Sequence, residues 1–192
     1  MKNKLQTKDF ISAGVFAAMY IIMLILTVTI TGIIPILYLF APLIVGIVCG
    51  TVYMLYVMKV QKSGAVLILS ILLGFVLSSH SWVSLVWSVL CGVVAEIILK
   101  QSNHASIKGM ITSYSAFACS TVGPFLTILF AKASFMESTA TYYGEAYAAT
   151  LDALTPPWII IVLIVLGIIG GIIGGNIGNK MLKKHFLKAG IV

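Results

Sequence analysis

The sequence contains no arginine, and charged residues of all kinds make up only 9% of its 192 residues. Apolar residues make up 60%, and the mean hydropathy is +1.13. A chain with so little polar surface cannot cover a water-soluble globule, so its solvent is a lipid bilayer. We therefore do not expect a soluble enzyme. The length suits about six spans of roughly 20 residues and leaves no room for a separate catalytic or nucleotide-binding domain.

Cysteine is also scarce, and its spacing matches no metal-binding motif. Cys49, Cys91 and Cys119 lie inside apolar stretches, without CxxC or Cys/His spacing. We interpret them as small packing residues and expect no disulfide framework, no protein-bound metal and no cofactor. The net charge of +7 comes from lysines that form short clusters between the apolar runs. This pattern is typical of membrane orientation and does not indicate nucleic-acid binding.

The apolar runs predict an all-α bundle of six transmembrane helices, which forms a single membrane domain over residues 1–192. The expected spans are 10–29, 37–58, 64–79, 83–99, 110–131 and 158–178. Eleven of the twelve lysines fall on one side of these spans, and only Lys132 falls on the other. The positive-inside rule then places both termini in the cytoplasm of a bacterial cell, with the spans in its cytoplasmic membrane.

The longest connection on the outer side, 132–157, is expected to form a lid loop. It carries Tyr142, Tyr143 and Glu145, and it ends in two prolines before Trp158. Long connections in compact proteins are uncommon and often functional. The third apolar run reaches only about 24 Å as a helix, so its outer end, with His80, is expected below the membrane surface.

Small residues mark faces where helices or partners approach closely. The first span carries Ala13, Gly14, Ala17 and Ala18, which suit packing inside the bundle or docking of a partner protein. The last span has two rows of glycines at four-residue spacing, and we favour packing inside the bundle for both. The rows are Gly167, Gly171 and Gly175, and Gly170, Gly174 and Gly178. The glycine-rich run 171–180 of this span lacks the Gly-Lys-Ser/Thr ending of a phosphate loop, so ATP-driven transport would need other subunits.

Several segments together resemble a known family. They are Lys8-Asp9-Phe10 with the following Gly14-Val-Phe-Ala-Ala-Met-Tyr20, Ile34-Pro-Ile-Leu-Tyr38, His80-Ser-Trp82, Leu154-Thr-Pro-Pro-Trp158, and the tail from Met181 to Ile191. Over essentially the whole chain, the sequence resembles the Trep_Strep family, regarded as substrate-binding S components of energy-coupling-factor (ECF) transporters.

The resemblance implies a six-helix membrane protein that captures a micronutrient at its outer face. Its partners would be a transmembrane coupling subunit, two ATPase subunits and membrane lipid. By the same resemblance, the small-residue face of the first span, formed by Ala13, Gly14, Ala17 and Ala18, would meet the coupling subunit.

Candidate ligand-binding residues are the polar and aromatic groups that gather on the outer side: His80, Trp82, Tyr38, Tyr142, Tyr143, Glu145 and Trp158. A planar micronutrient fits these aromatic groups, and haem is our leading expectation because His80 would then serve as an iron ligand. A flavin, pterin or other vitamin is the alternative. The tryptophans and Tyr38 could instead form an interfacial belt, His80 could be a solvated or capping residue, and Glu145 could lie in a solvated loop.

Glu96 lies near the inner end of the fourth span, four residues before Lys100. An intrahelical ion pair is the expected role, and a proton path is the alternative.

Rival functions for the whole protein are a self-contained secondary transporter, an intramembrane enzyme and a structural subunit. No inverted repeat favours the first, and no paired catalytic groups favour the second.

Overall fold

The computed structural model describes residues 5–79, 81–102 and 106–186, and these residues form helices and no strands. The elements in chain order are α1 (Thr7–Thr31), α2 (Pro35–Leu39), α3 (Ala41–Lys59), α4 (Ala65–Leu77), α5 (Trp82–Gln101), α6 (Ile107–Ala118), the 3-10 helix η1 (Cys119–Leu126), α7 (Thr127–Tyr143), α8 (Glu145–Leu154), α9 (Ile159–Met181) and the π-helical turn η2 (Leu182–Phe186).

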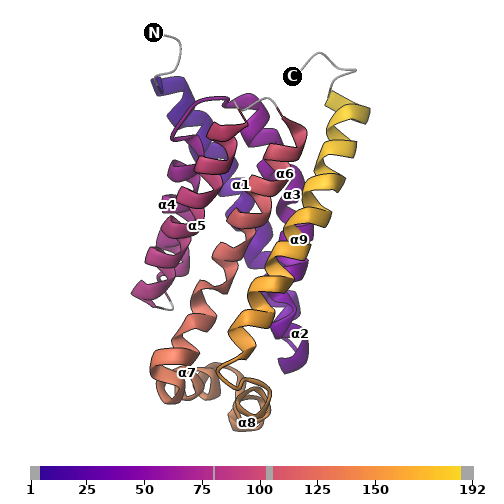
Figure 1. Cartoon of the computed structure of the whole chain (residues 1–192). Helices are drawn as coiled ribbons and strands as arrows, with labels where there is room; N and C mark the ends of the chain where they lie inside the picture. Colours follow the sequence, from indigo (N-terminus) through magenta and orange to yellow (C-terminus); the bar gives the residue numbers. More distant parts are fainter. Residues whose placement is uncertain (1–4, 80, 103–105, 187–192) are drawn as a thin grey trace.

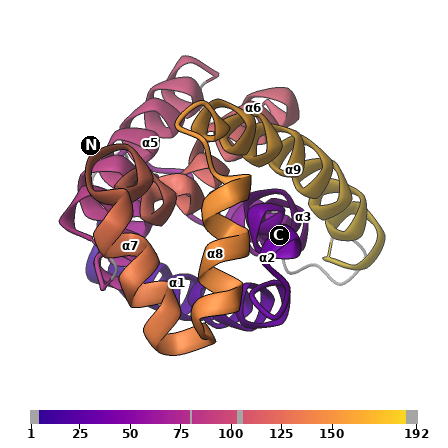
Figure 2. The same cartoon turned by 90° about the horizontal axis from the view of Figure 1, so that it is seen from below.

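The long helices stand side by side as a bundle, and α7 and α8 lie across one end of it (Figures 1 and 2). We call this the lid end. At the opposite end lie the start of α1, the α3–α4 connection and the ends of α5 and α9 (Figure 1). These segments carry lysines, so we call this the lysine end. That α1 begins and α9 ends at the same end agrees with the predicted even number of crossings, whereas which end faces the cytoplasm stays a prediction.

Five helical segments are long and apolar enough to cross a membrane: Thr7–Thr31, Ala41–Lys59, Trp82–Gln101, Ile107–Tyr143 and Ile159–Lys184. The remaining apolar helix, α4, has only 13 residues, fewer than the roughly 20 that a bilayer core requires. A multi-pass membrane protein is therefore supported, whereas the sixth crossing stays a prediction.

Two predicted spans are interrupted helices. The second predicted span is divided between α2 and α3, and each of these helices has a proline, Pro35 or Pro42, in its first turn. Proline is favoured there because the first N–H groups of a helix have no partner within it. The fifth predicted span changes from α6 into the 3-10 helix η1, which contains Pro124. Proline removes a backbone donor, and the chain tightens there into a 3-10 helix.

The predicted lid loop, 132–157, is helical, so the expectation of a loop was wrong. Most of it belongs to α7 and α8, which are joined at Gly144, where φ is +91°. Glycine adopts this backbone conformation without the steric cost that a side chain would add. A tight helical hairpin therefore replaces the loop.

The glycines of α9 pack inside the bundle, as we expected. A Cβ atom added at Gly46 of α3 would lie 2.8 Å from the backbone carbon of Gly170. On its neighbouring face, α9 places Gly175 where an added Cβ would be 3.2 Å from the Ile111 side chain of α6. The two glycine rows thus let α9 lie almost backbone to backbone against α3, and closely against α6.

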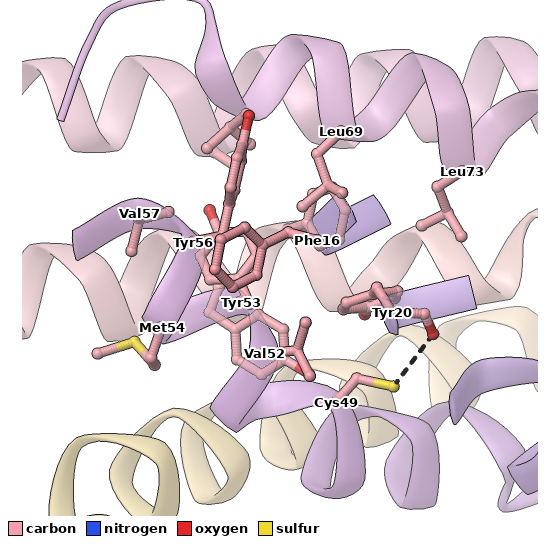
Figure 3. Close-up of a cluster of buried hydrophobic side chains, with 14 of the residues drawn as sticks. Phe16, Tyr20, Cys49, Val52, Tyr53, Met54, Tyr56, Val57, Leu69 and Leu73 are labelled. Atoms are coloured by element: carbon pink, nitrogen blue, oxygen red, sulfur yellow. Dashed lines mark hydrogen bonds between the residues drawn. The ribbon is translucent and has the colours of Figure 1, made fainter. Parts of the chain in front are cut away.

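A cluster of buried aromatic side chains fills the lysine-end half of the bundle (Figure 3). The ring of Tyr53 lies 4.8 Å from that of Tyr114 and 5.0 Å from that of Phe117, measured between centroids. The Tyr114 hydroxyl donates a hydrogen bond to the Gly46 carbonyl at 2.7 Å, and the Tyr56 hydroxyl donates to the Ala65 carbonyl at 2.6 Å. This half is therefore closely packed, with these polar groups satisfied.

Glu96 is a helix cap in this structure and not an intrahelical ion pair. Its carboxylate accepts hydrogen bonds from the backbone N–H groups of Gly64, at 2.6 Å, and Val66, at 3.0 Å. The free N–H groups at the start of α4 favour a negative charge there, which explains why this carboxylate is buried. Among the described residues, Glu96 forms no salt bridge with Lys100, because its oxygens face α4.

Candidate functional site

A cavity of about 250 Å³ lies in the lid-end half of the bundle. Its walls come from the second half of α1, from α2, from the start of α3, from the end of α4 and from η1. Most of the lining is aliphatic, including Leu24 and Val28 of α1 and Val45 of α3. Leu77 and Phe125 complete the apolar surface from α4 and η1. Such a concave, mainly apolar space is the usual form of a small-molecule site.

Tyr38 is the candidate ligand residue that lines this cavity. It lies on the short helix α2, and its ring is tilted against Phe125 with centroids 4.8 Å apart. Within the described part of the chain, its hydroxyl has no hydrogen-bond partner in the structure, unlike the hydroxyls of Tyr53, Tyr56 and Tyr114. A phenol that both donates and accepts is thus available to a ligand.

The other polar groups of the lining are the hydroxyls of Thr29, Ser79 and Thr121. Thr121 donates to the Ala118 carbonyl at 2.8 Å, and Ser79 donates to the Val76 carbonyl at 2.9 Å. Both hydroxyl protons are therefore engaged with carbonyl groups three residues earlier in the chain. None of the described lining residues carries a formal charge.

The lid hairpin of α7 and α8 is tied to the bundle through α8. The Tyr147 hydroxyl donates to the Gly32 carbonyl at 2.8 Å, and its ring stacks on Tyr143 with centroids 4.8 Å apart. Burial, and to a smaller extent the neighbouring Tyr143, raise the pKa of Tyr147 to about 12, so its phenol stays a donor at neutral pH. Because α8 packs on α2, this hairpin helps to hold Tyr38 at the cavity.

Within the hairpin, Lys132 and Asp152 form an ion pair, with the ammonium nitrogen 2.7 Å from a carboxylate oxygen. The same ammonium group donates to the Asp152 carbonyl at 3.0 Å. Lys132 therefore joins α7 to α8. Neither residue belongs to the lining of the cavity.

The remaining candidate ligand residues do not line the cavity. Trp82, Tyr142 and Trp158 have exposed fractions of 74%, 83% and 62%, and Tyr143 and Glu145 are also exposed. None of these five side chains belongs to the lining of the space that Tyr38 borders. His80 lies outside the residues that the structure describes.

The small residues of α1 do not form one surface. Ala13 and Ala17 are buried inside the bundle, because they face the aromatic core. Gly14 and Ala18 are exposed, and an added Cβ at Gly14 would meet no atom within 4 Å. Docking through Ala13 and Ala17 therefore does not fit this structure, whereas Gly14 and Ala18 remain accessible.

The sequence reasoning missed the contribution of η1, which supplies Thr121, Pro124 and Phe125 to the cavity. The sequence feature that indicated this helix break was the Gly123-Pro124 pair in the middle of an apolar run. Irregular backbone at membrane depth is tolerated where it is enclosed by protein or lines a cavity. This pair therefore pointed to the site more directly than the exposed aromatic residues did.

The chain is a polytopic helical membrane protein with a ligand-sized apolar cavity in the lid-end half of its bundle. In the part that the structure describes, no three His, Cys, Asp or Glu side chains are grouped so that they could hold a metal ion. The chain belongs to the Trep_Strep family, described as hypothetical bacterial integral membrane proteins, whose model matches residues 7–188. No curated protein matches the chain, and no solved structure matches it.

Proposed function

We propose that this protein is the substrate-binding S component of an ECF-type importer in a bacterial membrane. The observation that carries the proposal is the apolar cavity at the lid end, opposite the lysine end. If lysines mark the cytoplasmic side, the cavity lies toward the outside, where an importer captures its substrate. The sequence resemblance supports the same role.

The proposal assigns the energy source to other subunits. The glycine-rich run of α9 is a packing surface against α3 and α6, and it forms no phosphate loop. A membrane coupling subunit and two ATPases would supply ATP hydrolysis. On α1, the least buried of the five long apolar segments, Gly14 and Ala18 form a smooth accessible strip for the coupling subunit.

The cavity favours a smaller substrate than haem. Its volume of about 250 Å³ is below the roughly 300–1,000 Å³ that is usual for sites of drug-sized ligands. The described lining offers no cation for carboxylate groups such as the haem propionates. Ligation of haem iron by His80 stays a prediction, and the proposal adopts a compact micronutrient.

Co-expression with the energising subunits of the same genome tests the proposal. Affinity purification through this chain should recover the coupling subunit and both ATPases. Paired substitution of Gly14 and Ala18 by leucine should reduce that recovery at least fivefold. Val94→Leu, on the exposed face of α5, is the matched control and should leave recovery unchanged. Transport by the purified chain alone in vesicles would instead establish a secondary transporter, and the proposal would fail.

A further inference from the structure

The lining of the lid-end cavity is unsuited to a charged ligand. Its described residues are apolar or carry neutral hydroxyl groups. The nearby Lys132 and Asp152 neutralise each other within the lid hairpin and do not reach the lining. An ionised ligand would lose its hydration in this space without gaining a counter-charge, and that transfer is strongly unfavourable.

The dimensions of the cavity favour a compact ring system. A volume of about 250 Å³ accommodates one or two small rings and not an extended cofactor. The tilted pair of Tyr38 and Phe125 provides aromatic surface on one side. Leu24, Val28 and Leu77 provide aliphatic surface on others. Aromatic and aliphatic walls of this kind bind a planar apolar molecule through dispersion and loss of water contact.

Among the lining hydroxyl groups, that of Tyr38 lies beside the aromatic surface, whereas Thr29 is exposed. Thr121 and Ser79 already donate their hydroxyl protons to carbonyl groups of their own segments. The Tyr38 hydroxyl has no partner among the residues that the structure describes, although the Tyr38 side chain is half-buried and packs against Phe125 of η1. A polar group in such surroundings gains most from a ligand that completes its hydrogen bond.

We infer that the lid-end cavity takes an uncharged, mainly apolar ring compound with one hydrogen-bonding group, and that the Tyr38 hydroxyl is its specificity-determining partner. This inference rests on the proposed substrate-binding role and names the substrate class of the same site. It favours neutral aromatic or alicyclic nutrients as substrates and excludes carboxylated and phosphorylated ones.

Three fluorinated probes of similar shape test the inference by ¹⁹F NMR on the full chain in lipid nanodiscs at pH 7. Fluorobenzene is apolar, 4-fluorophenol adds a neutral hydroxyl, and 4-fluorobenzoate is ionised. We expect 4-fluorophenol to bind at least tenfold more tightly than 4-fluorobenzoate. Ala41→Phe, which fills the cavity from α3, should abolish binding of both neutral probes and so corrects for partition into lipid.

The decisive variant is Tyr38→Phe, which keeps the ring and removes the hydroxyl. It should weaken 4-fluorophenol binding about fivefold, as expected for one net hydrogen bond, and leave fluorobenzene binding unchanged. Tyr56→Phe removes a phenol hydroxyl at the lysine end and should leave the ratio of the two affinities unchanged. This ratio is informative even if the Ala41 variant does not fold.

Three results would overturn the inference: equal binding of 4-fluorobenzoate and 4-fluorophenol, an equal effect of Tyr38→Phe on both neutral probes, or no binding of either neutral probe. Recovery of the energising subunits is measured separately. Intact recovery with any of these results would reject the substrate class alone. Neutral-probe binding without recovery would reject the S-component role and retain the site.

Discussion

Tyr38 at the lid end differs from three buried tyrosines at the lysine end. In the lysine-end half, the hydroxyls of Tyr53, Tyr56 and Tyr114 all form hydrogen bonds with the bundle, and their rings fill the core. In the lid-end half, the Tyr38 ring borders a cavity, and its hydroxyl has no partner among the described residues. The same side chain thus gives rigidity where its polar group is satisfied and binding capacity where it is not.

The difference arises from the backbone around each tyrosine. At the lysine end, continuous helices bring carbonyl and hydroxyl groups within reach of these three phenols, such as Ser113 for Tyr53 at 2.7 Å. The buried Tyr20 hydroxyl in the same core has no hydrogen-bond partner among the described residues. At the lid end, the chain is interrupted at Phe40 and along η1. Side chains around interrupted helices cannot interdigitate as regularly, so the lid-end half retains empty space.

The largest effect is expected from Gly174→Leu, which would separate α9 from α3. An added Cβ at this position would lie 2.9 Å from the Ile47 Cα atom, and backbone cannot rotate away as a side chain can. We expect a loss of at least about 3 kcal/mol of folding free energy. Thermal unfolding in detergent and size-exclusion profiles measure it. Gly14→Ala, at an open position, is the control and should be neutral or slightly stabilising.

The next largest effect is expected from Glu96→Gln at the lysine end. The variant loses the negative charge and one of the two acceptors that receive the N–H groups of Gly64 and Val66. The expected destabilisation is about 1–2 kcal/mol, measured by denaturant unfolding in detergent. Glu137→Gln removes an exposed carboxylate from α7 and should change stability little. Equal effects of the two variants would contradict the capping role.

A direct comparison of the two halves comes from Tyr114→Phe and Tyr38→Phe in the ligand-free protein. The first removes the hydrogen bond to the Gly46 carbonyl and should cost about 1 kcal/mol. The second removes a hydroxyl without a described partner and should cost close to nothing. Matched thermal unfolding curves measure the difference. A larger loss from Tyr38→Phe would reverse our view of the two halves.

The smallest effect on global stability is expected from Tyr147→Phe, which removes the hydrogen bond to the Gly32 carbonyl. Hydrogen exchange should accelerate in α8 and leave α3 unchanged. Tyr142→Phe, on the exposed surface of α7, is the control.

The same hydrogen bond also has a defined pH dependence. The pKa of Tyr147 is raised to about 12 in the folded protein, so its stabilising effect is fully present below the ordinary tyrosine pKa of about 10. It should be lost progressively as the pH rises from about 10 to about 12. Exchange in α8 that already accelerates below pH 9 in the unmodified protein would contradict this assignment.

The sequence predicted the class and the main helices well because these depend on composition and on apolar run length. The bounds of α5 and α9 lie close to the predicted spans 83–99 and 158–178. Tyr38 was also recognised as a candidate residue, from its place between two apolar runs. Its neighbours Thr121 and Phe125 were missed, because contact between η1 and α2 depends on a break in a helix that hydropathy alone does not register.

The exposed aromatic residues are candidates that the sequence proposed for the site but that do not line the cavity. Trp82 and Trp158 flank apolar runs just as Tyr38 does, and composition cannot tell which of them face inward. Glu96 shows the same limit at the lysine end. Its neighbour in sequence is Lys100, but its partners are backbone groups 30 and 32 residues away.

The close approach of α3 and α9 distinguishes the cavity wall formed by α3 from the walls formed by the other helices. Through Gly46, Gly50, Gly170 and Gly174, the two backbones lie so close that a shift of one helix against the other would disrupt their packing. Ala41 and Val45 on α3 therefore belong to a stationary surface. We therefore expect ligand binding to change distances measured by probes on α1 and α4, while a probe pair on α3 and α9 keeps its separation.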